Sequence, residues 1–244
     1  MGRSNSATVD RAREAMGHLD DLSASSGATE PHLAYTDQLA AEAQSWVAPD
    51  SGLDDKLLRE RIRHPSLIKS LLLDRLPTHR FDVLEVGGGP LPLSDLLPFR
   101  SRIVVDPCTP SYREIAPCPD HWEATIEEWP DVCGDCHSFD LVIATNSLDH
   151  VRNAKAALAA MDWTLRKGGY MAIACNESNA HHHPHPSHAI NLTVGDIHRA
   201  FDAKYETVWQ LDYEHDRFVY GWRRVNGRAG QPAFCWLGRK AYDA

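Results

Sequence analysis

The residues with the clearest chemical potential are a glycine-rich turn and an acid that follows it at a set distance. Gly87, Gly88 and Gly89 come directly after the apolar run Phe81–Val86, and Asp106 ends the next apolar run about twenty residues later. In open α/β sheets such a turn lets the backbone approach a ligand closely, and the acid after the second strand binds ribose hydroxyls. The spacing therefore predicts a site for a nucleoside-containing cofactor, and a turn used only for packing is the alternative.

A histidine beyond a later apolar run offers acid–base chemistry. His150 lies in the segment Thr145–Val151, just after the run Phe139–Ala144. An unperturbed imidazole titrates near neutral pH, so His150 is a candidate to accept the proton that a nucleophile releases. A structural contact at the turn is the alternative that spacing leaves open. Asp149 beside it could orient the imidazole, but we favour for it the role of N-terminal cap of the next helix.

The most unusual segment is the histidine-rich loop His181–His188. Imidazoles bind zinc or ferrous iron, so a metal site is one interpretation, with Glu177 or Asp196 as an oxygen ligand. The usual metal-ligand spacings are absent, and we expect no bound metal. We favour contact with a substrate, and a solvated loop is the third interpretation. The candidate substrate-binding residues are Tyr35, His183, His185 and His188.

Cys133 and Cys136 form a single Cys-x-x-Cys pair in an expected surface connection. A structural zinc would need two more ligands, from Cys108, Cys118 or His137. We expect instead that the cysteines are mostly buried small hydrophobes in a reducing compartment.

Short apolar runs that alternate with helical patterns predict a parallel sheet. The expected strands are Phe81–Val86, Arg102–Asp106, Phe139–Ala144 and Tyr170–Cys175. Ala154–Leu165 has helical spacing, and we expect the glycines of Lys167–Gly169 to end that helix. Tyr205–Tyr213 and Ala233–Lys240 predict an antiparallel strand pair at the sheet edge. The chain is thus expected to be a Rossmann-like α/β protein with helices on both faces of a mostly parallel sheet.

The part of the chain before the first strand has a different pattern. Residues 1–30 predict a flexible tail, because they lack a sustained apolar stripe. Residues 31–78 predict an N-terminal helical cap, and residues 79–244 predict the main domain. The expected cap helices are His32–Val47, Leu53–Ile62 and Ser66–Leu76.

From about residue 80 to residue 178, the order of motifs resembles the class I, S-adenosylmethionine-dependent methyltransferases of small-molecule type. The matching segments are the acid-x-Gly-x-Gly turn from Glu85, the acid Asp106, the Phe-Asp-Leu-Val strand from Phe139 and the Leu-x-x-Gly-Gly segment from Leu165. The resemblance implies a seven-stranded sheet with an antiparallel C-terminal pair and S-adenosylmethionine as the cofactor.

The resemblance also assigns roles to residues. It places Glu85 and the glycine turn on the methionine side of the cofactor, Asp106 on the ribose, and Asn146 toward the transferring methyl. The implied cofactor-binding residues are Glu85, Gly87, Gly88, Gly89, Asp106, Thr125, Ile126, Asn146 and Ser147. Thr125 and Ile126 fall where the family contacts adenine, and His150 is the candidate catalytic residue.

One position departs from the family pattern. Leu91 stands where the family often has a third glycine, which puts the shape of the cradle in question. A dinucleotide site is less favoured, because the G-x-G-x-x-G spacing is missing. The alternatives to methyl transfer are the same fold used for cyclisation or elimination, a noncatalytic partner subunit, and a metal-dependent enzyme that uses the histidine loop.

Composition excludes some classes of partner. A formal charge of −9 argues against a nucleic-acid-binding surface, which needs clustered Lys and Arg. No run approaches the roughly 20 apolar residues of a membrane span, and no secretory signal is evident. We expect a cytoplasmic protein with a small-molecule substrate from specialised biosynthesis, without nucleic-acid or membrane partners, as a homodimer or heterodimer.

Overall fold

The computed structural model describes residues 35–46, 66, 68–113, 119–134, 138–177, 190–214 and 232–241. These residues form a seven-stranded sheet with the order β3-β2-β1-β4-β5-β7-β6. The strands are β1 (Phe81–Val86), β2 (Phe99–Val105), β3 (His121–Trp122), β4 (Phe139–Thr145), β5 (Leu165–Asn176), β6 (Tyr205–Glu214) and β7 (Pro232–Lys240). Strands β1 to β5 are parallel, and β7 is antiparallel to both β5 and β6. The predicted mostly parallel sheet with an antiparallel C-terminal pair is confirmed.

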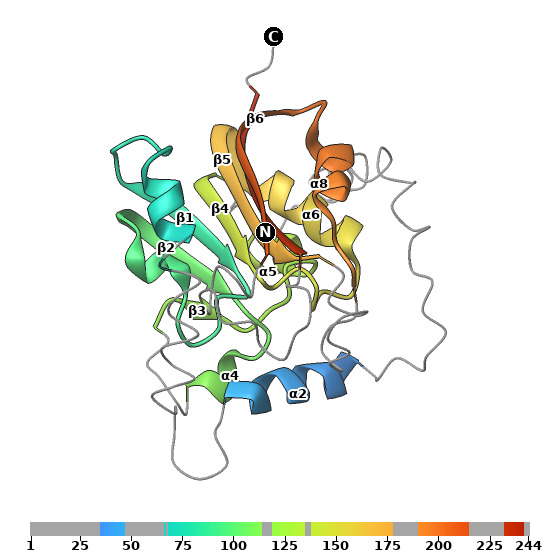
Figure 1. Cartoon of the computed structure of the whole chain (residues 1–244). Helices are drawn as coiled ribbons and strands as arrows, with labels where there is room; N and C mark the ends of the chain where they lie inside the picture. The colour runs from blue at the N-terminus through green and yellow to red at the C-terminus, as the bar shows by residue number, and fades with distance from the viewer. Residues whose placement is uncertain are drawn as a thin grey trace, which may run out of the picture.

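One face of the sheet is covered by α5 (Trp129–Val132), α6 (Ala154–Thr164) and α8 (Val194–Phe201), which Figure 1 shows beside the strands. Leu158 and Met161 of α6 are fully buried in this layer. Phe201 of α8 stacks on Trp236 of β7, with ring centroids 5.7 Å apart. Each large side chain buried here stabilises the fold by about 1.5–3 kcal/mol, which is more than helix propensity alone supplies.

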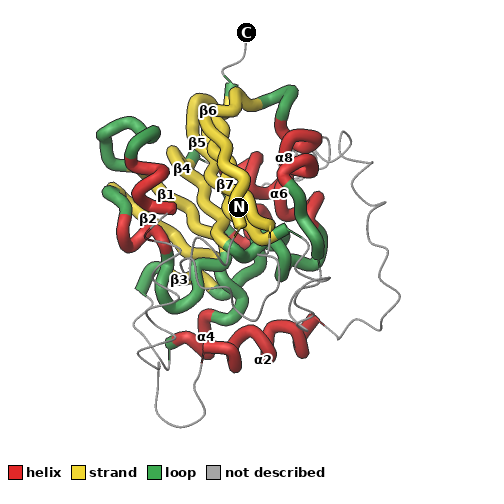
Figure 2. The backbone as a smooth tube through the Cα atoms, viewed as in Figure 1, coloured by secondary structure: helices red, strands yellow, loops and turns green. Residues whose placement is uncertain are grey.

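The other face is covered by helical residues 68–73 and by the 3-10 helix η2 (Leu93–Leu96). Ile68 and Leu72 pack there against Val83 of β1, Ile143 of β4 and Leu237 of β7. Figure 2 shows helices on both sides of the strands. The predicted coverage of both faces is confirmed, and so is helix within the predicted range Ser66–Leu76.

Helices α2 (Tyr35–Trp46) and α4 (Thr109–Tyr112) lie beyond the carboxyl ends of the parallel strands (Figure 1). Leu39 and Ala43 of α2 pack against Cys108 and Tyr112, and the Cys108 thiol donates to the Leu39 carbonyl oxygen at 3.5 Å. The first predicted cap helix is therefore confirmed as a helix. The second, Leu53–Ile62, and the predicted tail, residues 1–30, lie outside the described residues.

The prediction that Lys167–Gly169 ends a helix was wrong. Helix α6 ends at Thr164, and β5 begins at Leu165. Phe139 of β4 pairs with Leu165, but Leu141 pairs with Tyr170, so residues 166–169 form a bulge within β5. Gly168 takes a φ of 72° there, a backbone conformation that glycine adopts at bulges as well as at helix ends.

Within the ranges that the structure describes, no helix has both the length and the apolar character needed to cross a membrane.

Candidate functional site

The glycine turn after β1 is held against the turn after β4. Gly87 has a φ of 64°, and its N–H donates to the carbonyl oxygen of Val105 at 2.8 Å. A Cβ atom on Gly87 would lie 2.4 Å from the Cβ of Ser147, and real Cβ contacts are never that short. The Ser147 hydroxyl donates to the carbonyl oxygen of Val86 at 2.7 Å. Only glycine fits position 87, and the contact joins two of the predicted cofactor-binding segments.

The Glu85 side chain and the Gly88 backbone both contact neighbouring parts of the protein. Both carboxylate oxygens of Glu85 accept backbone N–H groups, from Leu93 at 2.7 Å and from Ser94 at 2.8 Å. Burial raises the pKa of the Glu85 carboxyl above its ordinary value. A Cβ on Gly88 would lie 2.8 Å from Val104 Cγ1. Glu85 therefore fixes the chain that follows the glycine turn, while Gly88 allows close packing on β2.

Asp106 lies directly against the glycine turn. One carboxylate oxygen accepts the N–H of Gly89 at 3.0 Å, and the other accepts the N–H of Cys108 at 2.8 Å. The residue is only 4% exposed, and burial raises the pKa of its carboxyl to about 6. The two N–H donors oppose that rise, whereas the carboxylate of Glu42 on α2 adds to it. The structure thus places the second-strand acid where the sequence predicted it, with its charge buried.

Thr125 and Ile126 precede α5 and are both buried. The Thr125 N–H donates to Glu128 Oε2 at 3.2 Å, and the Glu128 N–H donates to Thr125 Oγ1 at 3.3 Å. This reciprocal pair fixes the turn that precedes α5. Arg152 donates to the same Thr125 hydroxyl oxygen at 3.1 Å, and its bond to Glu128 lowers the pKa of that carboxyl. Ile126 faces the apolar core.

Asn146 is strained and incompletely bonded. It follows β4 with a φ of 53°, and it alone among the described non-glycine residues has a positive φ. Its side-chain oxygen is buried and has no hydrogen-bond partner in the described part of the chain. The same holds for the hydroxyl of Thr145 on β4 and the side-chain oxygen of Asn176 on β5. Strain and unsatisfied buried oxygens at one place are typical of a functional site.

The predicted base lies between two acids. His150 Nε2 is 3.6 Å from Asp149 Oδ1, and His150 Nδ1 is 3.9 Å from Glu42 Oε2 on α2. Asp149 is fully buried. The prediction that Asp149 caps the next helix was wrong. Asn153 is the cap of α6, and its side chain accepts the N–H of Ala156 at 3.0 Å. The predicted cap was therefore four residues too early, because the helix begins at Ala154 and the residue directly before it is Asn153.

Helix α2 brings Tyr35 to the same region. The guanidinium of Arg152 lies 4.7 Å from the centre of the Tyr35 ring, a cation–π distance. The helix thus contacts the segments after β2 and β4 through Leu39, Glu42 and Tyr35. The other predicted substrate-binding residues, His183, His185 and His188, lie outside the described residues, as do Cys136 and His137. In the described ranges, no group of three or more His, Cys, Asp or Glu side chains could hold a metal ion.

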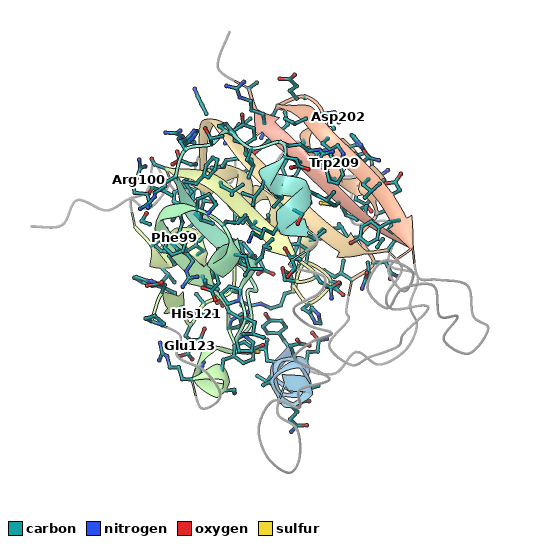
Figure 3. The ribbon with its side chains drawn as sticks, turned by 60° about the vertical axis from the view of Figure 1, so that its left-hand side comes forward. Phe99, Arg100, His121, Glu123, Asp202 and Trp209 are labelled. Atoms are coloured by element: carbon teal, nitrogen blue, oxygen red, sulfur yellow. The ribbon has the colours of Figure 1, made fainter. Side chains whose placement is uncertain are left out.

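Sequence reasoning missed two groups that shape this end of the sheet. His121, labelled in Figure 3 at the end of the sheet nearest α2 and α4, has its Nε2 2.9 Å from the carbonyl oxygen of Gly89. Glu127 Oε1 accepts the N–H groups of Arg152 at 2.9 Å and Asn153 at 3.2 Å. Glu127 stands in an acidic pair before a short helix, and nothing in that local pattern predicts its contacts with the turn after β4. No local pattern marks His121.

Comparison with known proteins identifies the fold. No protein-family model and no curated protein matches the sequence. The 1,6-didemethyltoxoflavin-N1-methyltransferase of Burkholderia thailandensis, solved with 1,6-didemethyltoxoflavin and S-adenosylhomocysteine, is 17% identical with a TM-score of 0.54, over 88% of this chain and 94% of that one. The N-methyltransferase NodS of Bradyrhizobium japonicum, with S-adenosylhomocysteine, is 14% identical with a TM-score of 0.56, over 84% and 100%. The YcgJ protein of Bacillus subtilis is 14% identical with a TM-score of 0.53, over 74% and 99%. The chain has the class I methyltransferase fold.

The residues at the carboxyl ends of the strands fit an adenosyl cofactor. The turn at Gly87–Gly89 is left-handed at Gly87 and Gly89, and Gly87 and Gly88 are glycines because their backbone packs closely on Ser147 and on Val104. A carboxylate can accept about four hydrogen bonds, so Asp106 keeps acceptor capacity beyond the bonds from Gly89 and Cys108. The unsatisfied oxygen of Asn146 supplies a further acceptor nearby.

Proposed function

We propose that this chain is an S-adenosylmethionine-dependent methyltransferase that acts on a small molecule in the cytoplasm, in specialised biosynthesis. The observation that carries the proposal is the convergence of three segments at one end of the sheet. They are the glycine turn after β1, Asp106 after β2 and the Asn146–Ser147 turn after β4, which the Gly89–Asp106 and Val86–Ser147 hydrogen bonds tie together. Ligands bind at this end of open α/β sheets.

On the cofactor side, each segment has a distinct task. The cofactor supplies a methyl group on a sulfonium, open to in-line displacement by a nucleophile. The glycine turn gives close approach of the backbone, and ionised Asp106 accepts the ribose hydroxyls. The capped segment at Thr125 and Ile126 forms the adenine side. Rigid placement of these groups contributes to the rate, because alignment can lower the barrier by several kcal/mol.

On the acceptor side, the chain offers hydrogen-bond acceptors and a base. The unsatisfied oxygens of Thr145, Asn146 and Asn176 suit an acceptor that carries N–H or O–H groups. His150 takes the proton that the acceptor releases. Asp149 at 3.6 Å, together with Glu42, stabilises the imidazolium that forms. Tyr35 and the predicted substrate residues His183, His185 and His188 complete the acceptor side.

Helix α2 serves as part of a cap, within the proposed cap of residues 31–78. It packs on Cys108 and Tyr112, and its Glu42 carboxylate lies close enough to raise the pKa of the Asp106 carboxyl. Because Asp106 is 4% exposed, a ribose reaches it only when α2 moves outward and then closes again. Closure excludes water and strengthens the electrostatic contacts inside.

Calorimetric titration of S-adenosylhomocysteine into the full chain tests the proposal. We expect one site per chain, with a dissociation constant in the range of about 1 μM to 1 mM. NAD is the matched control, because it shares the adenosine but has no methionine. Absence of heat with both S-adenosylmethionine and S-adenosylhomocysteine would contradict the proposal, and so would equal binding of NAD.

A second function is favoured by one observation. The oxygens of Asp106 already bond Gly89 and Cys108, and Leu91 packs against the Cys108–Tyr112 cluster, so the cradle is well satisfied without a ligand. This arrangement suits a protein of the same fold that catalyses cyclisation or elimination, or that serves as a noncatalytic partner subunit. Formation of S-adenosylhomocysteine in step with product would rule out this second function.

A further inference from the structure

His121 lies beside the glycine turn because it belongs to β3, an edge strand of the sheet. It begins β3, where it pairs with Val104 of β2, and its residue is only 6% exposed. Its Nε2 lies 2.9 Å from the carbonyl oxygen of Gly89, although the two residues are 32 positions apart. Figure 3 shows His121 at the end of the sheet that faces α2 and α4.

Gly89 is thus held on both sides. Its N–H donates to Asp106 at 3.0 Å, and its carbonyl oxygen accepts from His121. Gly89 has a φ of 59°, so the direction of its N–H and carbonyl groups depends on a backbone conformation that needs outside support. If the carbonyl lost its donor, the turn could rotate and withdraw the N–H from Asp106.

The protonation of the imidazole follows from these contacts. A carbonyl oxygen only accepts, so Nε2 carries the hydrogen. Burial lowers the pKa of His121, and the charge of the Arg102 guanidinium lowers it further. The hydrogen bond to Gly89 and the negative charges of Asp95 and Asp120 act in the opposite direction. The ring is therefore neutral near pH 7, with a bare Nδ1 that is buried and has no hydrogen-bond partner among the described residues. Among the described residues, the Nε2–H bond to Gly89 is the one hydrogen bond of this side chain, and a leucine of similar bulk would leave the Gly89 carbonyl oxygen without that donor.

We propose that His121 is a positioning residue, which holds the glycine turn in its ligand-binding shape through the Nε2–H bond to Gly89. The inference rests on the proposed function, because it concerns the same cofactor cradle. His121 acts through Gly89 and Asp106 and does not touch the reacting atoms. It affects cofactor affinity, and hence KM for the cofactor, much more than kcat.

The first test is the state of the imidazole itself, measured without any ligand. Nitrogen-15 NMR of the full chain, with His121 assigned by substitution, should show the Nε2–H tautomer at about pH 8 and a midpoint of protonation below about 6.5, the ordinary imidazole value. The Nδ1–H tautomer would overturn the proposal, and so would a ring that titrates at the ordinary value.

The second test compares two substitutions with a matched control. His121→Gln keeps an N–H donor near the Nε2 position, whereas His121→Leu keeps the bulk and removes the donor. His198→Leu is the control, because His198 bonds Asp202 at 2.8 Å and Gln210 at 2.7 Å, outside the glycine turn. Affinity for S-adenosylhomocysteine should fall about tenfold in His121→Leu, stay within about threefold in His121→Gln, and be unchanged in the control.

The outcomes separate the two proposals. If the unaltered chain binds no S-adenosylhomocysteine, the proposed function fails, and the imidazole measurement still decides whether His121 holds the turn. If the chain binds but His121→Leu binds equally well, the His121 proposal fails alone. Faster hydrogen exchange at the Gly89 amide in His121→Leu is expected, and an unchanged rate would also overturn it. If His121→Leu does not fold, the tautomer and the affinity of His121→Gln decide.

Discussion

The two ends of the sheet both carry buried carboxylates, but they neutralise them differently. At the amino end, Asp140 accepts the N–H of Asp82 at 2.8 Å and lies 2.6 Å from the guanidinium of Arg166. Arg100 pairs with both Asp82 and Asp140, and its hydrogen bond lowers the pKa of the Asp82 carboxyl. These acids are satisfied by cations from neighbouring strands, so the network is typical of a structural ion-pair cluster.

At the carboxyl end, Asp106 has backbone N–H donors in place of a cation, and its pKa is raised to about 6. Nearby oxygens of Thr145 and Asn146 lack partners in the described part of the chain. The amino end also contains a cleft of about 110 Å³, lined by Phe81, Tyr170 and the Asp140–Arg166 pair. Asp140 Oδ1 at the amino end also lacks a hydrogen-bond partner among the described residues, but the Arg166 cation lies 2.6 Å from it, so what distinguishes the carboxyl end is a buried carboxylate without a cation.

We expect the largest effect from substituting alanine for glycine at a positive φ, once at each end of the sheet. Gly87→Ala would force a Cβ to 2.4 Å from Ser147 at a positive φ, so we expect S-adenosylhomocysteine affinity to fall at least 100-fold. Gly168→Ala is the matched control at the amino end, where φ is 72°. It should lower the free energy of unfolding by about 1–2 kcal/mol and leave affinity unchanged. Calorimetry and urea denaturation measure the two effects, and equal affinities in both variants would contradict the comparison.

The two buried carboxylates should respond in opposite ways to loss of charge. Asp106→Asn removes an anionic ribose acceptor, so affinity should fall about 10- to 100-fold. It also takes one accepting oxygen from the N–H groups of Gly89 and Cys108, but the loss of a buried charge offsets this, so the net loss of stability should be small. Asp140→Asn leaves Arg166 without its carboxylate partner, so stability should fall by about 1–2 kcal/mol with affinity unchanged. A stability loss in Asp106→Asn as large as that in Asp140→Asn would show that both ends are structural.

The pH dependence should also differ between the ends. Protonation of Asp106, with its pKa of about 6, should weaken S-adenosylhomocysteine binding about fourfold at pH 5.5 relative to neutral pH, and Asp106→Asn should abolish this dependence. Because the folded pKa is raised, the Asp106 contribution to the free energy of unfolding increases as pH falls through 6. The pKa of Asp82 is lowered, so its contribution is present above about pH 4 and is lost below it. Affinity that does not change with pH in the unaltered chain would contradict the role of Asp106.

The smallest expected effect concerns the strained residue after β4. Asn146→Gly relieves a φ of 53° and should raise the free energy of unfolding by about 1 kcal/mol. It also removes an unsatisfied oxygen, so affinity for S-adenosylhomocysteine should fall a few-fold. Asn153→Gly is a control at the helix cap, where we expect a loss of only a few tenths of a kcal/mol and no change of affinity. An Asn146→Gly variant that is less stable but binds normally would show that the strain serves the fold.

The strands were predictable because parallel strands buried on both faces are continuous apolar runs, such as Phe81–Val86. The bulge at Gly168 was not, since a helix end and a β-bulge both accept glycine with positive φ.

In the site, spacing alone located Asp106 against the glycine turn. The inward direction of Glu85 and the reach of His121 to Gly89 depend on side-chain direction across strands, which local pattern does not encode. The alternatives that the sequence left open were therefore those that tertiary packing decides.

The position of β7 has a consequence for synthesis. It is inserted between β5 and β6 and carries Phe234 and Trp236, which are 0% and 1% exposed. The ribosome must therefore make residues 232–240 before β5 gains its second neighbour. Until then, one edge of β5 in the nascent chain has unpaired N–H and C=O groups beside apolar surface. Such an edge is prone to aggregation. We expect chaperones to bind this protein late in translation, after residue 176 has emerged and before residue 232 has.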